Sequence, residues 1–326
     1  MSQSSPLLAA QPALADLHRH LDGSLRPTTV AELAAQTGQA VPPDLAFVPG
    51  MGLAAALSRF AYTLSLLQTP QAVARVAAEM CEDAAAEGVT TLEIRFAPQL
   101  HLQRGASIEA IVDAALRGIA DRAGLILCGL YGEPPSVLEQ LVALAKARPG
   151  VVGIDLAGGP SDSHAVRMSD YARAFVQARE LGLGRTVHAG EGRPPAEIRD
   201  AIACLHAQRI GHGTTLLDDP QVTDLVLRRG VLIEACPTSN WHTGAITSVA
   251  EHPLPRWLDR GIAVCVCADN TLLSATDARR ELAAVARLPG MDERKIQSLI
   301  QAGHAGAFRR RDATQHTKEI DRNRNV

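Results

Sequence analysis

The feature that most constrains the fold is a repeated alternation of short apolar segments with longer amphipathic ones. Eight segments have the length and composition of strands, and several are continuously apolar: 14–18, 90–96, 125–130, 151–156, 185–188, 208–211, 231–235 and 262–268. Such strands are typical of a parallel sheet that is covered on both faces. Most of them are separated by Ala-rich amphipathic segments with the length of crossover helices, at 71–87, 107–122, 136–147, 168–181, 195–206 and 219–229.

Eight strand and helix units in 326 residues predict an α/β fold, a TIM-like (β/α)8 barrel. The alternative is an open, doubly wound parallel sheet. The first strand is not followed by the G-x-G-x-x-G pattern that a dinucleotide-binding version of that sheet would carry. We therefore expect one barrel over residues 14–307.

The connection between the first two strands, residues 19–89, is much longer than the others. It contains three prolines and two glycines between 42 and 52, followed by an apolar stretch over 53–67. This pattern predicts a helical lid, inserted after strand 1 at about residues 41–70, over the mouth of the barrel. A peripheral helix pair explains the pattern equally well. We expect residues 1–13 to be disordered and residues 308–326 to form a charged, solvated C-terminal tail.

Composition narrows the class of partner. The formal net charge is −3, whereas proteins that bind a phosphate backbone normally carry a basic face. Five Phe, three Tyr and two Trp are too few to suggest a base-stacking platform. No uncharged apolar stretch approaches the length of a membrane span, and no basic segment precedes the N-terminal Ala/Leu run. We expect a cytoplasmic protein that acts on a small molecule, binds neither nucleic acid nor membrane, and keeps its six scattered cysteines as buried thiols.

Titratable residues stand where several of the apolar segments end, which is where barrel enzymes carry their functional groups. His18 and His20 are two positions apart, so both imidazoles face the same side of an extended chain. This pair alone is a weak indication of a metal site. His188 closes the fifth segment, and Glu191 follows it after Gly190, whose backbone freedom permits a tight turn over the mouth.

The remaining strand ends extend this set. His212 stands between two glycines after the sixth segment, and Asp269 follows the eighth. Barrel closure places the eighth strand beside the first, so we expect Asp269 near His18 and His20. Three imidazoles and one carboxylate suit Zn²⁺ with a position left for water, whose pKa the metal lowers toward 7. Glu191 and His212 then remain for proton transfer.

Six segments in order, spanning nearly the whole chain, resemble the adenosine deaminase family of the amidohydrolase superfamily. They are residues 17–27, 155–158, 188–191, 209–213, 236–240 and Asp269. A single such segment is moderately specific, whereas six in family order are very specific. The resemblance implies hydrolytic replacement of a purine 6-amino group by oxygen, with release of ammonia.

The resemblance also implies a role for each matching residue. One Zn²⁺ per chain would be held by His18, His20, His188 and Asp269. Glu191 would protonate purine N1, and His212 would orient the attacking hydroxide and help to take its proton. The substrate-binding residues would be the ligand His20, Asp22 near the ribose 5′-hydroxyl, Gly158 with its N–H at N3, and Asn270.

Asn270 is a departure, because many family members carry a second aspartate there that hydrogen-bonds N7. An Asn amide donates to N7 directly, so binding stays plausible while substrate preference becomes open. The expected substrate is adenosine or 2′-deoxyadenosine, giving inosine or deoxyinosine. The alternatives are 6-aminodeoxyfutalosine, adenine and an N6-modified nucleoside or nucleotide. The carboxylate of Asp22 suits a neutral 5′-hydroxyl and would repel a 5′-phosphate, which favours a nucleoside.

Two other functional classes stay open at this stage. A general amidohydrolase with two metals usually has a bridging lysine, and none stands near the end of the fourth segment. A catalytically inactive binding protein would have lost a ligand or Glu191, and all are present. Oligomeric state is left open. Among weaker candidates, buried Glu234 needs a partner, for which Arg95 is one choice, and Phe60 and Tyr62 wall a purine or belong to the core.

Overall fold

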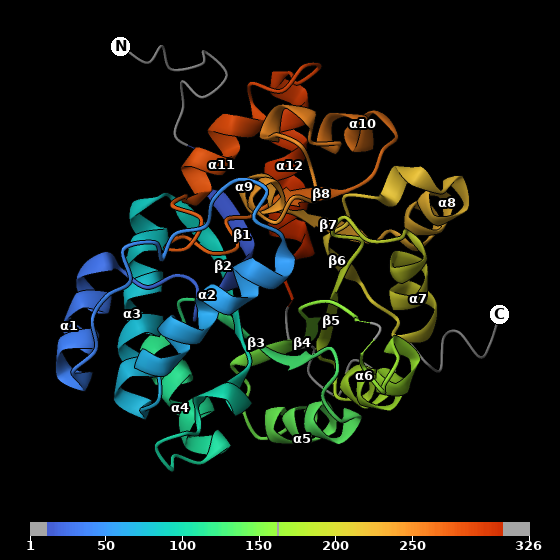
Figure 1. Ribbon diagram of the computed structural model, residues 1–326. Helices are drawn as coiled ribbons and strands as arrows, with labels where there is room; N and C mark the ends of the chain where they lie inside the picture. Colours follow the sequence, from blue (N-terminus) through green and yellow to red (C-terminus); the bar gives the residue numbers. More distant parts are fainter. Residues whose placement is uncertain (1–11, 162, 309–326) are drawn as a thin grey trace, which may run out of the picture.

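The structure is a computed structural model, and it describes residues 12–161 and 163–308 (Figure 1). Most of the two predicted terminal segments, residues 1–11 and 309–326, therefore lies outside the described residues. Each strand pairs in parallel with the next in one eight-stranded sheet. The strands are β1 Leu14–His20, β2 Val89–Phe96, β3 Gly124–Leu130, β4 Val151–Ala157, β5 Gly184–Ala189, β6 Arg209–His212, β7 Leu232–Ala235 and β8 Val264–Val266.

The first and last strands meet, which makes the sheet a barrel. The backbone N–H of His20 donates to the carbonyl of Asp269 and that of Asp269 to the carbonyl of His18, both at 2.8 Å. Deeper in the sheet, the thiol of Cys265 on β8 lies 3.6 Å from the carbonyl oxygen of Ala15 on β1. The predicted TIM-like barrel is confirmed, and the open doubly wound sheet is wrong.

Helices surround the strands (Figure 1). They are α1 Pro27–Thr37, α2 Leu53–Leu66, α3 Pro70–Ala86, α4 Ile108–Ile119, α5 Pro135–Ala145, α6 Ala172–Glu180, α7 Ala196–Cys204, α8 Pro220–Arg229, α9 Pro237–His242, α10 Leu254–Asp259, α11 Ala278–Val285 and α12 Glu293–Gly306. Several begin where a side chain accepts a hydrogen bond from the first turn, as Thr69, Ser107 and Asp219 do. The segment predicted as one helix at 168–181 is a short 3₁₀ turn followed by α6.

Three helices fill the long connection between β1 and β2. Of these, α3 is the crossover helix, while α2 passes in front of the strands in Figure 1. Two backbone hydrogen bonds hold the loop before α2 against the segments that follow β7 and β8. The N–H of Phe47 donates to the carbonyl of Leu273 at 2.6 Å, and that of Gly50 to the carbonyl of Trp241 at 3.0 Å. The loop before α2 is therefore held against segments that follow β7 and β8, and the helical lid stays a prediction.

Two expectations from composition can be compared with this structure. Of the six cysteines, five are buried and Cys204 is half-buried, and all six are free thiols. Within the described ranges, none of the helices combines the length and the hydrophobicity that a membrane span requires.

Candidate active site

Three imidazole nitrogens and one carboxylate oxygen converge where β1, β5 and β8 end. The Nε2 atom of His20 lies 3.2 Å from His18 Nε2, 3.3 Å from His188 Nε2 and 3.5 Å from Asp269 Oδ1. Ligand atoms bound at 2.0–2.1 Å to one tetrahedral zinc ion would lie about 3.3 Å apart. The distances from His20 Nε2 to the other three donors are therefore compatible with one metal ion, and the groups that could hold an ion are His18 with His20 and His188, and His18 with His212 and Asp269.

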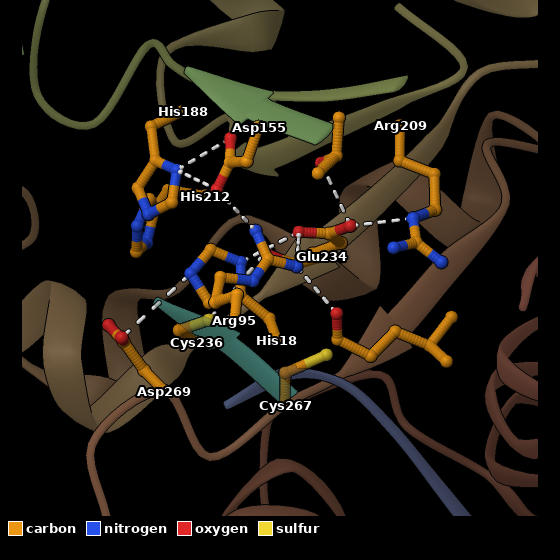
Figure 2. A network of polar contacts seen from close by, with 12 residues as sticks. His18, Arg95, Asp155, His188, Arg209, His212, Glu234, Cys236, Cys267 and Asp269 are labelled. Atoms are coloured by element: carbon orange, nitrogen blue, oxygen red, sulfur yellow. Dashed lines mark hydrogen bonds and ion pairs between the residues drawn. The ribbon is translucent and has the colours of Figure 1, made fainter. Parts of the chain in front are cut away.

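Hydrogen bonds behind two of the rings fix which nitrogen faces the centre. His18 Nδ1 lies 2.7 Å from Glu234 Oε2, and His188 Nδ1 lies 3.0 Å from Asp155 Oδ2 (Figure 2). An ionised carboxylate can only accept, so each Nδ1 carries the proton and each Nε2 presents a lone pair. A metal ion needs lone pairs, and this donor set supplies them.

Burial keeps the rings of His18 and His20 uncharged. Removal from water, together with the positive charge of Arg95, holds the pKa of His18 well below its usual value. Burial and the neighbouring His188 do the same to the pKa of His20. Neutral imidazole is the form that binds metals, so the surroundings favour metal binding over protonation.

Arg95, fully buried on β2, connects the two supporting carboxylates. Its Nη1 donates to Asp155 Oδ2 and its Nη2 to Glu234 Oε2, both at 2.9 Å. Nη2 also donates to the carbonyl of Leu17, next to the ligand His18. A buried cation is tolerated when anions compensate it, and here two do so. The expected pairing of Glu234 with Arg95 is present, and Asp155 is a second partner that the sequence did not suggest.

A second polar cluster lies beside the metal centre. Glu191 Oε1 accepts from Thr243 Oγ1 at 2.9 Å and from Asn240 Nδ2 at 3.3 Å. The same Asn240 nitrogen faces His212 Nδ1 at 3.0 Å, and that ring nitrogen lies 3.7 Å from Glu191 Oε1. Burial raises the pKa of Glu191, but the nearby charges of His212 and Arg193 outweigh it and bring the value below the ordinary one.

Asn240 and Thr243 were not predicted as site residues. Asn240 belongs to one of the segments that carried the family resemblance, so the sequence offered an indication of its role. Thr243 follows α9 directly and has no comparable signal. His212 and Asp269 both adopt left-handed backbone conformations, with φ of 70° and 60°, which turns their side chains at the strand ends.

One pocket opens on these groups. Three of the four predicted substrate-binding residues line it, and so does Phe60, whereas Asp22 and Tyr62 do not. The lining residues are His20, Phe47, Leu53, Ala56, Leu57, Phe60, Gly158, His188, Glu191, His212, Ser239, Thr243, Asp269 and Asn270. The pocket thus brings together side chains from the strand ends, α2 and the loop before it.

Two small features of the pocket bear on ligand binding. Gly158 has φ of 77°, and a Cβ placed on it would meet nothing within 4 Å, so its backbone faces open space. Asp22, 6% exposed, lies next to the pocket, and burial raises its pKa to about 7. Within the described part of the chain, its Oδ1 is buried without a hydrogen-bond partner.

Asn270 contacts a predicted metal ligand directly. Its Nδ2 donates to Asp269 Oδ1 at 2.7 Å, while its own Oδ1 is buried and finds no partner among the described residues. Gly23 makes room for this amide, because a Cβ there would lie 1.9 Å from Asn270 Oδ1. The side chain is therefore placed to hold Asp269, and Asn270 also belongs to the lining of the pocket.

Comparison with known proteins agrees with this architecture. The family profile described as adenosine deaminase matches residues 13–322. A curated adenosine deaminase of Enterococcus faecalis is 34% identical over 310 residues, which cover 90% of this chain and 91% of that protein. An adenine deaminase from Arthrobacter aurescens has a TM-score of 0.81 at 26% identity, covering 97% of this chain and 100% of that one.

Another solved relative is the N6-methyl-AMP deaminase of Arabidopsis thaliana. It has a TM-score of 0.80 at 26% identity and covers 94% of this chain and 95% of that one. The family profile spans all eight strands, and the Enterococcus relative exceeds 30% identity over most of its length. On these grounds the chain belongs to the adenosine deaminase family of metal-dependent hydrolases that act on C–N bonds.

Proposed function

We propose that this protein is a zinc-dependent hydrolytic deaminase of a 6-aminopurine nucleoside, converting adenosine or 2′-deoxyadenosine to inosine or deoxyinosine and ammonia. The observation that carries the proposal is a donor set compatible with one metal ion, opening on the same pocket as Glu191, His212 and Gly158. Relatives named adenosine deaminase support the choice of substrate.

In this proposal His18, His20, His188 and Asp269 hold one Zn²⁺ per chain. When bound, the ion lowers the pKa of a water molecule and so supplies a nucleophile at neutral pH. Glu191 hydrogen-bonds purine N1 and places a proton there, which makes C6 more electrophilic. Because its pKa is below the ordinary value, the free side chain is ionised, so it carries a proton only after the substrate and water have bound.

The proton balance agrees with this role. Water supplies the oxygen that ends on C6, one proton that stays on N1 of the product and one that leaves with ammonia. Glu191 therefore ends each cycle as it began. His212 is proposed to orient the attacking oxygen: Asn240 Nδ2 donates to its Nδ1, so the neutral ring carries its proton on Nε2 and donates from there to that oxygen.

The other contacts select the substrate. In this proposal the Gly158 N–H donates to N3, and the Asn270 amide donates to N7. Asp22 is proposed to bind the 5′-hydroxyl. Its unpaired, buried carboxyl oxygen supports this, because such an atom is costly unless a ligand or water hydrogen-bonds it. A 5′-phosphate would be repelled there. A cytoplasmic location stays a prediction.

The test is a substrate panel with the zinc-loaded, full-length protein, following loss of the adenine absorbance band and release of ammonia. We expect adenosine and deoxyadenosine to give the highest kcat/KM, followed by 6-aminodeoxyfutalosine, adenine and AMP. A tenfold preference for adenine or AMP would refute the nucleoside assignment. If a protein with one zinc per chain deaminates none of the five, deamination of these purines is the wrong function.

A further inference from the structure

The N-terminal end of the barrel, opposite the pocket, is closed by Phe308, two residues after the end of α12. The aromatic ring of Phe308 lies over the guanidinium of Arg209, with 3.6 Å between Cζ and the ring centroid. The backbone N–H of Phe308 also donates to Glu93 on β2. A guanidinium over an aromatic face is an attractive arrangement, and burial strengthens it.

Two glycines on neighbouring strands make room for this ring. Gly153 on β4 and Gly184 on β5 are paired in the sheet. A Cβ on Gly184 would lie 2.0 Å from Phe308 Cγ, and one on Gly153 would lie 2.8 Å from Phe308 Cδ2. Glycine weakens a strand interior unless another group must approach closely, and here the approaching group is the ring.

Arg209 connects this ring to the metal centre. Its Nη1 donates to the carbonyl of Gly306 at 3.0 Å, and its Nε lies 2.7 Å from Glu234 Oε1. The other oxygen of Glu234, Oε2, is the one that lies 2.7 Å from His18 Nδ1 (Figure 2). A continuous series of contacts therefore runs from Phe308 through Arg209 and Glu234 to His18.

Every polar member of this series is buried. Arg209 is 1% exposed, and Glu234 and His18 are fully buried. Arg209 also pairs with Glu93, so two anions compensate it. If Arg209 moved, Glu234 would lose one of the charged partners that set its orientation, which is costly for a buried carboxylate.

We propose that Phe308 is a positioning residue for the metal centre: by holding Arg209 it fixes Glu234 and thereby the orientation of the ligand His18. The inference rests on the proposed function in requiring that the centre binds zinc. In this proposal Phe308 not only closes one end of the barrel but also increases the affinity for the metal.

The test compares zinc affinity in metal-free, full-length variants by chelator competition. Mutating a residue that hydrogen-bonds a metal ligand from outside typically lowers metal affinity 10- to 100-fold. Because Phe308 acts through Arg209, we expect Phe308→Ala to raise the zinc Kd about tenfold, at the low end of that range. Gly184→Ala should do the same, since its methyl group would displace the ring.

His304→Ala is the matched control. His304 anchors α12 through Thr91 and the carbonyl of Ala13, without touching Arg209. This variant should lower Tm while leaving the zinc Kd within twofold of wild type. Phe308→Leu keeps an apolar side chain in the slot but loses the aromatic face, so it provides the same comparison if the Ala variant does not fold.

The outcomes separate the inference from the proposed function. If Phe308→Ala and Phe308→Leu lower Tm but bind zinc as tightly as wild type, Phe308 only seals the barrel and the inference is wrong. If the wild-type protein itself binds no zinc, the proposed function fails, and the inference, which requires a zinc centre, fails with it.

Discussion

Two layers of the site differ in how tightly the fold holds them. The supporting layer beneath the histidines consists of Arg95, Asp155, Arg209 and Glu234, each at most 1% exposed and each in contact with oppositely charged groups. The pocket wall consists of Phe47, Leu53, Leu57 and Phe60, contributed by α2 and the loop before it. Within the wall, Leu57 is 45% exposed.

This difference suggests that the supporting layer serves the chemical step and the pocket wall serves substrate selection. Removing one partner of a buried ion pair typically costs 3–5 kcal/mol, because a charge is left uncompensated. Apolar contacts are non-directional, and an apolar side chain can be exchanged for another of similar volume at under about 1.5 kcal/mol. The wall can therefore change with the substrate while the supporting layer cannot. The predictions below test that division, from the largest effect to the smallest.

His188→Ala should abolish both bound zinc and turnover, because a site that depends on three imidazoles loses one. Metal content of the purified variant and its deaminase rate are the measurements. The control is His206→Asn, which should keep both zinc and turnover. His206 is exposed, and asparagine tolerates the left-handed backbone at that position. A folded His188→Ala protein with full zinc occupancy would contradict the ligand assignment.

Glu191→Gln should keep zinc and nucleoside affinity but lose turnover by about 10²- to 10⁴-fold, the usual worth of general acid catalysis. The amide fills the same volume and can still hydrogen-bond N1, yet it cannot deliver a proton. Zinc content, inhibitor binding and kcat should be measured on the same preparation. A loss in kcat below tenfold would exclude Glu191 as the acid.

Asp155→Asn should weaken zinc binding by about 10- to 100-fold while leaving nucleoside KM unchanged in the metal-saturated protein. The substitution removes a charge that both His188 and Arg95 contact. Asp113→Asn breaks a surface pair with Arg148 and serves as the control. Equal zinc affinity in Asp155→Asn and wild type would mean that the buried layer does not support the metal.

Asn270 lies on the boundary between the two layers. Losing a buried hydrogen bond costs about 1–3 kcal/mol, so Asn270→Ala should lower kcat/KM for adenosine by roughly 5- to 150-fold. Replacing N7 by carbon, in 7-deazaadenosine, should erase the difference between wild type and Asn270→Ala if Asn270 binds N7. An equal loss with both substrates would instead assign Asn270 to holding Asp269, as the contact with that carboxylate suggests.

Phe60→Ala should have the smallest effect, a rise in nucleoside KM of about 5- to 30-fold with kcat and zinc affinity unchanged, since truncating an apolar wall contact costs roughly 1–2 kcal/mol of binding. Its ring lies 6.3 Å from that of His20. Tyr62→Ala, on the same helix but outside the pocket lining, should leave KM nearly unchanged. A drop in zinc affinity with Phe60→Ala would remove the distinction between wall and supporting layer.

The sequence predicted the strands and the converging side chains because both leave local signals. Continuous apolar runs mark the strands, and a histidine or aspartate at the end of such a run is conspicuous. Strand ends were less predictable. The segment 262–268 was predicted as one strand, but β8 is only Val264–Val266, and the left-handed backbone at Asp269 turns the chain soon after it.

Contacts between distant segments left no such signal. Asn240 reaches Glu191 from a six-residue helix, and Phe308 reaches Arg209 from the far end of the chain. Neither pairing follows from periodicity or spacing, because each depends on how the barrel closes. Glu234 was the partial exception: a carboxylate inside an apolar strand needs a partner, and Arg95 was one choice on pattern alone.

The seam between β1 and β8 has a consequence for how the protein is made. His18 and His20 leave the ribosome early, whereas Asp269 and the partner strand β8 follow only near the end of synthesis. For most of translation the nascent chain contains His18 and His20 but cannot bring them together with Asp269, because a domain completes its folding only when its last elements emerge. If the four proposed ligands form one centre, its assembly is therefore a late event, and a messenger truncated before β8 would encode the histidines without Asp269.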